Sequence, residues 1–382
     1  MLTWEFPPQI VGGLSRHVYG LAKELVFFNW EIHVVTAKKN KESSYENVEG
    51  IHVWRVAPLN DGDNDFLQWV AGLNLAMAEK AFSLAENNHF SLVHAHDWLV
   101  GAAALCVKKF LQIPLIATIH ATEHGRNNGI YTELQRFIHE KERTLADQSD
   151  HVIVCSNFMK KEITNVFRTA ENKISVIANG VEKGNRFFRK EVPFPAFPID
   201  ENRKMIFSLG RMVAEKGFDI LIEAARRMGE MGTDVYFIIA GNGPLLNDYK
   251  QKVQALSLQN TVYFIGFIDD YMRIKLLEKC YMAVFPSRYE PFGIAALEAM
   301  IAAKPVIAAN VGGLKEIIRH GRTGLLMEPD NPDSFIEQAV FLLKHREVAA
   351  RMGELGKKYV ENFFSWRKAA ESTDKVYRRF AR

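Results

Sequence analysis

The chain has 382 residues, of which 48% are hydrophobic and 24% are charged, and its net charge is +3 at pH 7. That length predicts two or three domains, and that composition is typical of a globular protein. The small net charge gives no support for nucleic-acid binding, and the absence of a long apolar run argues against stable membrane insertion.

The chain opens with a predicted short strand, Met1 to Trp4, and a loop that contains Gly12 and Gly13. A helical pattern follows, and its apolar residues share one face. Glycines at the start of a helix permit a turn with positive φ or a close approach of the backbone to a ligand.

Strands are predicted at Ile32 to Thr36 and at Ile51 to Val56, with a solvated polar loop, Lys38 to Glu49, between them. In the next loop, Asp61 and Asp63 have the spacing of a D-x-D metal motif. Turn-forming residues surround these aspartates and no buried strand precedes them, so we expect no metal there.

Polar side chains end the next two strands. A helix over Leu67 to Ala85 leads to a strand that ends in His94-Ala-His96-Asp97-Trp98, and alternation places both histidines on one face. Two histidines and Asp97 could ligate a metal ion, but the sequence offers no third cluster to complete a site. The strand Leu115 to Ile119 then ends at His120, and Arg126 follows in the same polar stretch.

The rest of the first half contains a predicted helix, Leu134 to Ala146, and a strand that ends at Ser156, a residue suited to cap the next helix. The strand Ile174 to Ile177 comes before Asn179 and an exit turn. Residues 191–204 contain three prolines and little periodicity, which is typical of a linker. We therefore predict an N-terminal domain over residues 1–190 and a C-terminal domain over residues 191–364.

The second domain begins with an apolar strand, Met205 to Leu209, whose loop carries two cations, Arg211 and Lys216, before a helical pattern starts at Phe218. The planar fork of an arginine and the point charge of a lysine both suit phosphate oxygens. Such a pair alone is usually solvated surface, so its meaning depends on the second strand–loop–helix unit described below.

Glycine-containing loops follow the next two strands. Gly241 and Gly243 come after the buried strand Val235 to Ala240, where they could accommodate a base or a ribose. Phe267 comes after the strand Val262 to Phe264.

The second strand–loop–helix unit begins with the apolar run Tyr281 to Phe285. Its loop contains Glu290, and Gly293 and Ile294 open a helix that carries Glu298 about two turns on. The first turn of a helix has unpaired N–H groups and the positive end of the helix dipole, so it attracts an anion. Carboxylates that flank an anion site more plausibly accept from hydroxyls, and the two units together indicate a nucleotide diphospho-sugar site.

Several of these stretches resemble motifs of GT-B glycosyltransferases of the family 4/5 type, and of bacterial glycogen (starch) synthases in particular. Arg211 and Lys216 are similar to that group's R-x4-K pair, and Glu290 and Glu298 to its E-x7-E motif. E-F-P-P-Q-I-V-G-G-L, V-H-A-H-D-W and T-I-H-A-T-E-H-G-R resemble the group's N-terminal and middle motifs, in the same order.

The resemblance implies two Rossmann-like, doubly wound α/β domains that face a cleft, with residues 365–382 packed back on the first domain. It also implies a longer first strand than Met1 to Trp4, and a glycine where this chain has Ala303, so we expect a different local turn there.

Roles carry over position by position from the resemblance. Gly12 and Gly13 would lie by the donor phosphates and the acceptor, Asp97 and Trp98 would meet the acceptor, and His120 would lie beside the transferred sugar. Phe267 would mark the loop that holds the base through backbone contacts, and Asn179 is taken as a further substrate-binding residue. Catalytic roles are expected for His120, Arg211, Lys216 and Glu290, and Glu298 would bind the ribose hydroxyls.

The predicted reaction is transfer of glucose, with retention, from ADP- or UDP-glucose to the non-reducing end of an α-1,4-glucan. We expect no cofactor and no metal, because two cations and a helix dipole can replace Mg²⁺ at the leaving diphosphate. The three scattered cysteines, Cys106, Cys155 and Cys280, are expected to be buried thiols in a reducing cytoplasm, and no signal peptide is predicted.

Two other functions stay open. Enzymes that make maltose 1-phosphate from glucose 1-phosphate share the T-I-H-A-T-E-H-G-R likeness, and Arg126 is a candidate cation for a phosphorylated acceptor. A non-catalytic nucleotide-sugar binding protein is the alternative from another class. A dinucleotide-dependent dehydrogenase is disfavoured, because no G-x-G-x-x-G follows the first strand. Neither the donor base nor the oligomeric state follows from the sequence.

Overall fold

The computed structural model describes residues 1–38, 44–60, 65–181 and 203–381. The chain divides into two compact units, the first made of Met1–Gly180 with Trp366–Arg382 and the second of Val181–Ser365. The predicted boundary after residue 190, most of the predicted linker, and Asp61 and Asp63 lie outside the described residues.

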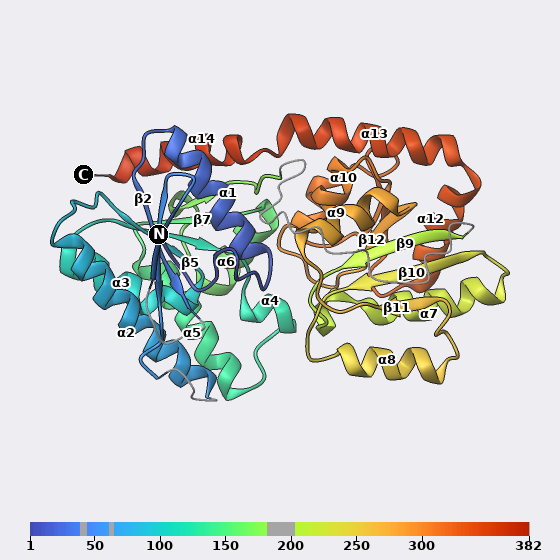
Figure 1. Cartoon of the computed structure of the whole chain (residues 1–382), viewed down its shortest axis with the longest axis horizontal. Coiled ribbons are helices and arrows are strands. Elements are labelled where there is room, and N and C mark those ends of the chain that lie inside the picture. The colour runs from blue at the N-terminus through green and yellow to red at the C-terminus, as the bar shows by residue number, and fades with distance from the viewer. Residues whose placement is uncertain (39–43, 61–64, 182–202, 382) are drawn as a thin grey trace. The chain divides into compact units, whose positions relative to one another are not determined.

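In the first unit the described strands, of which β2, β5 and β7 are labelled in Figure 1, form one sheet. The strand order is β3-β4-β2-β1-β5-β6-β7-β8. Every pairing in this sheet is parallel except that of β3 with β4. The strands are β1 Leu2–Thr3, β2 Ile32–Ala37, β3 Ser44–Val48, β4 Ile51–Val56, β5 Val93–His96, β6 Leu115–Ile119, β7 His151–Val154 and β8 Ile174–Val176.

Helices connect these strands, as the alternating patterns predict. They are α1 Gly13–Phe27, α2 Phe66–Ala85, α3 Gly101–Leu111, α4 Glu123–Asn127, α5 Glu133–Gln148 and α6 Asn157–Phe167, and the C-terminal helix α14 Trp366–Phe380 joins the same unit. Local signals fix several helix starts. Ser156 caps α6 as predicted, because its hydroxyl accepts from the N–H of Met159 at 3.1 Å.

Two expectations for this unit are wrong. Part of the predicted polar loop is strand β3, an antiparallel edge strand whose exposed polar residues carry no apolar alternation to reveal it. Cys106 is exposed, because α3 turns it toward solvent, whereas Cys155 and Cys280 are buried and all three are free thiols.

The C-terminal helix α14 packs against α1, as predicted. The indole of Trp366 lies directly over Gly20, where an added Cβ would come within 2.4 Å of it. Farther along α14, Asp374 accepts from the Trp30 indole N–H at 2.7 Å, and the Tyr377 hydroxyl lies 2.6 Å from His94 Nδ1. These contacts make α14 part of the first unit's core.

The second unit is built on a parallel sheet with the order β11-β10-β9-β12-β13-β14. Its strands are β9 Lys204–Leu209, β10 Val235–Ala240, β11 Val262–Phe264, β12 Met282–Phe285, β13 Val306–Ala309 and β14 Leu325–Met327. Its helices are α7 Phe218–Glu230, α8 Leu246–Ala255, α9 Asp270–Lys279, α10 Ile294–Ile301, α11 Leu314–Ile317, α12 Pro332–Lys344 and α13 Arg346–Phe363.

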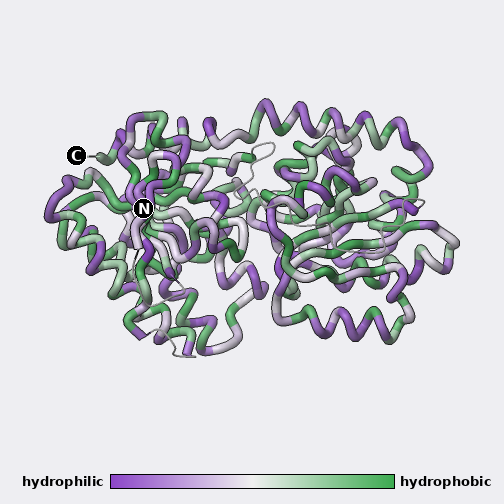
Figure 2. The backbone as a smooth tube through the Cα atoms, viewed as in Figure 1, coloured by the Kyte–Doolittle hydropathy of each residue, from purple (hydrophilic) through white to green (hydrophobic). Residues whose placement is uncertain are grey.

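The strands of this second sheet read as continuous apolar runs because both faces of a parallel sheet are covered by helices. All six residues of β10 are buried, for example, and hydrophobic residues gather along the strands (Figure 2). The predicted doubly wound α/β architecture is therefore confirmed in both units. No described helix is both long enough and apolar enough to cross a bilayer.

Candidate active site

In the second unit the predicted donor residues lie where the strand order reverses. The chain runs from β9 to β10 and β11 on one side, and from β12 to β13 and β14 on the other. Open parallel sheets bind ligands outside the carboxyl ends of the strands at such a switch point. Arg211 follows β9 and Glu290 follows β12, so the two loops expected to form the site flank this point.

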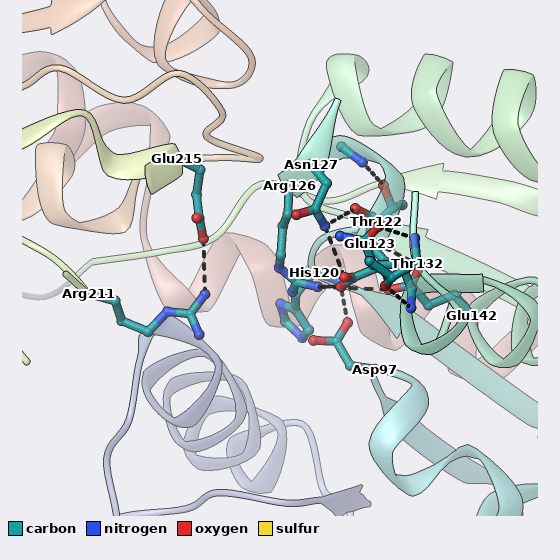
Figure 3. A network of polar contacts seen from close by, with 12 residues as sticks. Asp97, His120, Thr122, Glu123, Arg126, Asn127, Thr132, Glu142, Arg211 and Glu215 are labelled. Atoms are coloured by element: carbon teal, nitrogen blue, oxygen red, sulfur yellow. Dashed lines mark hydrogen bonds and ion pairs between the residues drawn. The ribbon is translucent and has the colours of Figure 1, made fainter. Parts of the chain in front are cut away.

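The structure brings Lys216 and Glu290 together. Lys216 Nζ lies 2.7 Å from Glu290 Oε2, and the two side chains are only 21% and 16% exposed. Ser287 also donates its hydroxyl to Glu290, at 3.3 Å. Arg211 lies 3.3 Å from Glu215 and is more exposed (Figure 3). Each predicted cation therefore has a carboxylate partner within its own unit.

Glycines allow these loops to approach each other closely. Gly217 has φ +68°, and a Cβ on it would lie 2.2 Å from the carbonyl oxygen of Pro286. Gly312 has φ +48°, and a Cβ there would lie 2.1 Å from the carbonyl oxygen of Glu290, while the Gly313 N–H donates to that oxygen at 2.8 Å. The backbone beside Lys216 and that of Glu290 are thus fixed by contacts that only glycine permits.

Glu298 lies on α10, whose N-cap residue is Gly293, in the left-handed region. Its carboxylate is paired with Arg273 of α9, which also lies 3.2 Å from the buried Asp270. Sequence reasoning did not identify Arg273, because the pairing joins two helices that are separate in sequence.

The structure places Gly293 and Ile294 at the start of α10, where the first N–H groups have no acceptor within the helix. Gly241 and Gly243 have a packing explanation instead. A Cβ on Gly241 would lie 1.8 Å from the oxygen of Gly210, and one on Gly243 would lie 2.6 Å from the oxygen of Met212. Phe267 is exposed.

The first unit also has a switch point, between β1 and β5. The loop after β1 contains Gly12 and Gly13, β5 leads to Asp97, and β6 leads to His120. The loop after β1 depends on a residue that sequence reasoning missed. The buried Glu5 carboxylate accepts from the Val11 and Gly12 N–H groups at 2.5 and 3.1 Å.

Asp97 ties the ends of β5 and β6 together. Its Oδ1 accepts from the backbone N–H of His120 at 2.7 Å (Figure 3), and its own backbone is in the left-handed region, with φ +63°. Burial raises the pKa of Asp97 to about 6. Trp98, by contrast, is buried in a small apolar cluster with Val70 and Ile138. Its structural position is therefore that of a core residue beside the site.

His120 belongs to a group of histidines. Its Nε2 lies 3.3 Å from Nδ1 of His96, and its ring meets that of His17 edge-on at 4.5 Å between centroids. His17 Nδ1 lies 2.7 Å from Asn179 Oδ1, which gives Asn179 a structural role. Burial, together with Arg126, lowers the pKa of His120 to about 3, so the imidazole is neutral at pH 7. His17 was missed, although it lies one helical turn beyond the Gly12-Gly13 loop.

Arg126 lies on the short helix α4 among carboxylates. It is 3.8 Å from both Glu123 and Glu142, and both oxygens of Glu142 accept from the Glu123 N–H, at 3.0 and 2.9 Å (Figure 3). Burial raises the pKa of Glu142 to about 8. Glu142 is a further residue that the sequence did not single out, because its contacts depend on how α5 packs against α4.

Comparison with known proteins covers both units. Residues 11–184 match the family model described as Glycosyltransferase Family 4, and residues 190–359 match the model described as Glycosyl transferases group 1. An uncharacterized glycosyltransferase of Methanocaldococcus jannaschii is 34% identical, over 99% of this chain and 97% of the relative.

Two relatives of stated activity also align along the whole chain. A glycogen synthase of Mycobacterium tuberculosis is 31% identical over 99% of this chain and 93% of its own length. An alpha-maltose-1-phosphate synthase of Mycolicibacterium smegmatis is 27% identical over 99% of this chain and 98% of its own.

Solved structures share the fold at low identity. A sucrose-phosphate synthase from Thermosynechococcus elongatus superimposes with a TM-score of 0.86 at 20% identity, covering 99% of this chain and 97% of that one. The catalytic domain of starch synthase IV from Arabidopsis thaliana, bound to ADP and acarbose, gives 0.79 at 17% identity, with 99% and 98% coverage.

Switch-point loops with paired charges occur on many α/β sheets, and they do not by themselves name a family. Here they coincide with family matches to both halves of the chain and with a full-length relative above 30% identity. The chain therefore belongs to the group 1, family 4 glycosyltransferases, GT-B enzymes that use nucleotide-sugar donors.

Proposed function

We propose that this enzyme transfers glucose from ADP- or UDP-glucose to the non-reducing end of an α-1,4-glucan, with retention of configuration and without a metal ion. The observation that carries the donor half is the contact of Lys216 with Glu290 at 2.7 Å, in loops that flank the switch point of the second sheet. It joins a cation suited to phosphate to a carboxylate suited to sugar hydroxyls, as a nucleotide sugar requires.

The chemical difficulty is the departure of a diphosphate that gains negative charge. Cations held in place at that leaving group stabilise the transition state more than the ground state. In the proposal Arg211 and Lys216 take this role, helped by the N–H groups at the start of α10, while Glu290 turns from Lys216 to the hydroxyls of the sugar. Glu298 binds the ribose, and Arg273 holds that carboxylate in place.

For the acceptor, we favour a neutral glucan over glucose 1-phosphate. Arg126, the candidate cation for a phosphorylated acceptor, already lies 3.8 Å from two carboxyl groups, Glu123 and Glu142. A phosphate at Arg126 would meet the Glu123 carboxylate and would have to displace it. A glucan hydroxyl needs hydrogen-bond partners and no cation, and in the proposal Asp97 and the neutral His120 are these partners.

A screen of ADP-glucose and UDP-glucose against glycogen, maltose and glucose 1-phosphate tests this proposal. We expect elongation of glycogen or maltose with one of the two donors. Turnover with glucose 1-phosphate alone would assign maltose-1-phosphate synthesis instead. Donor binding with neither transfer nor hydrolysis across the screen would identify a non-catalytic binding protein.

Two further measurements address the mechanism. EDTA should leave turnover unchanged, and a loss that Mg²⁺ reverses would contradict the metal-free mechanism. Proton NMR of the first-formed product should show an α linkage, and a β linkage would refute retention.

The three free cysteines support a reducing, cytoplasmic setting for the reaction.

A further inference from the structure

Three histidines from separate parts of the first unit meet beside the predicted acceptor residues. His17 comes from α1, His96 ends β5 and His120 follows β6. One ring nitrogen of each lies within 4.8 Å of a ring nitrogen on both others, and the His96 Nδ1 to His120 Nε2 distance is 3.3 Å. His17 and His96 are buried.

Two nitrogens in this cluster lack hydrogen-bond partners among the described residues. They are His17 Nε2 and His96 Nε2, and both are shielded from solvent. His96 meets His120 through its other nitrogen, Nδ1, so only the His17 atom bears on a site shared with His120. A buried polar atom without a partner is unfavourable, so such atoms usually contact a bound water or ion. The neighbouring His94 differs in this respect, because Tyr377 and Thr118 hydroxyls satisfy both of its nitrogens.

The hydrogen bond to Asn179 fixes which nitrogen of His17 is available. An amide oxygen can only accept, so the contact of His17 Nδ1 with Asn179 Oδ1 at 2.7 Å puts the proton on Nδ1. The lone pair is then on Nε2, the nitrogen without a partner. Histidines that ligate metals usually donate their other N–H to a protein oxygen in this way.

We propose that His17, His96 and His120 form a site for Zn²⁺, and that zinc bound there inhibits sugar transfer. Three imidazole nitrogens with an open fourth position form a known coordination set for this ion. Tetrahedral zinc with bonds of about 2.1 Å holds its ligands roughly 3.4 Å apart. Nδ1 of His96 and Nε2 of His120 already have this spacing, at 3.3 Å, and Nε2 of His17 has to move closer to complete the site.

Inhibition follows from the use of His120 as a ligand. A zinc ion on its ring nitrogen removes the group that lies beside the transferred sugar in the proposed function, and it places a divalent charge there. This consequence rests on the proposed function, whereas zinc binding does not. Zinc is thus an inhibitor here, which is compatible with a reaction that needs no metal.

A second histidine cluster could also bind Zn²⁺, so a titration of the first site requires a variant that lacks the second. Glu31, His33 and His52 also come close enough to hold an ion. Their ring nitrogens have protein partners: His33 Nε2 lies 2.9 Å from Glu31 and His52 Nδ1 lies 3.0 Å from the Tyr45 hydroxyl. The His52→Gln variant eliminates this cluster without touching the first.

Calorimetric titration of metal-free His52→Gln protein with Zn²⁺, repeated with Co²⁺ to follow the d–d absorption of tetrahedral coordination, tests the binding. We expect one site, which His17→Gln in the same background abolishes and Asn179→Ala weakens by about 10–100-fold. Thermal unfolding of each variant shows that the fold is retained. Unchanged zinc affinity in a folded His17→Gln variant, or no binding to the His52→Gln protein, overturns the proposal.

The inhibitory consequence is tested in the same background. Zn²⁺ should reduce transfer in proportion to site occupancy, EDTA should reverse the effect, and the His17→Gln variant should resist it. Zinc bound at this site with full turnover would overturn the inhibitory role and the placement of His120 beside the sugar, while leaving the metal site itself intact. Absence of zinc binding with normal transfer would overturn the metal site and leave the proposed function standing.

Discussion

Replacing Lys216 by methionine should lower both the free energy of unfolding and kcat, for two reasons that can be measured separately. Lys216 and Glu290 form a contact of 2.7 Å between side chains that are both mostly buried. In Lys216→Met, Glu290 keeps the hydroxyl of Ser287 at 3.3 Å and loses its charged partner. Leaving a partly buried carboxylate uncompensated costs about 1–3 kcal/mol of unfolding free energy. Loss of a cation at the leaving group costs about 10²–10³-fold in kcat, by analogy with oxyanion donors.

The double variant Lys216→Met with Glu290→Gln separates the two effects. Because neither charge is present in the double variant, its loss of unfolding free energy in urea should be about 1–2 kcal/mol smaller than the sum of the losses in the two single variants. The kcat, measured at saturating donor, should stay as low as in either single variant, because the residues act in one step. Lys275→Met breaks an exposed pair with Glu278, 3.1 Å long, and should change stability by less than about 0.5 kcal/mol. Recovery of kcat in the double variant, or near-normal kcat in Lys216→Met, would refute the assigned role.

Three other predictions concern stability. Ala303 has φ +57°, which favours glycine, so Ala303→Gly should raise the free energy of unfolding by about 0.5–1 kcal/mol in urea titration; a loss would show that the turn is unstrained. Gly20→Ala should lower it by about 1–3 kcal/mol, because the new Cβ meets the Trp366 indole, and an unchanged midpoint would contradict the packing of α14. Glu142 has its pKa raised to about 8 from 4.5, so the folded state holds its proton longer and stability falls as pH rises between these values. In Glu142→Gln the free energy of unfolding, measured by chemical denaturation at several pH values, should fall less steeply with pH, by up to about 1.4 kcal/mol per pH unit. The same pH dependence in the variant as in the wild type would show that another group causes the fall.

The strand ends and loops that the sequence marks explain how much of the fold and of the candidate site could be predicted. Apolar runs located the strands of both sheets except the polar edge strand β3, and the loops after β9 and β12 contain the charged residues Arg211, Lys216 and Glu290. These signals are local, because a strand end and the next helix start lie within a few residues. The positions of Asp97 and His120 at strand ends were visible in the sequence, and the resemblance supplied the roles expected of them.

What could not be predicted depends on pairing across the fold. Glu5, Arg273 and Glu142 hold predicted site residues in place, yet each contact joins elements whose packing no sequence pattern reveals. The histidine cluster was missed for the same reason, since α1 brings His17 to two strand ends. Polar edge strand β3 lacked apolar alternation, and the exposure of Cys106 depends on which face α3 turns to the sheet.

A crystal structure with bound ADP or UDP would show whether Arg211 and Lys216 hold the diphosphate of the donor. We predict diphosphate oxygens within about 3 Å of both side chains, near the start of α10, with Lys216 turned from Glu290 to the phosphate. A diphosphate bound elsewhere, with the contact between Lys216 and Glu290 intact, would show that these two cations do not stabilise the leaving group.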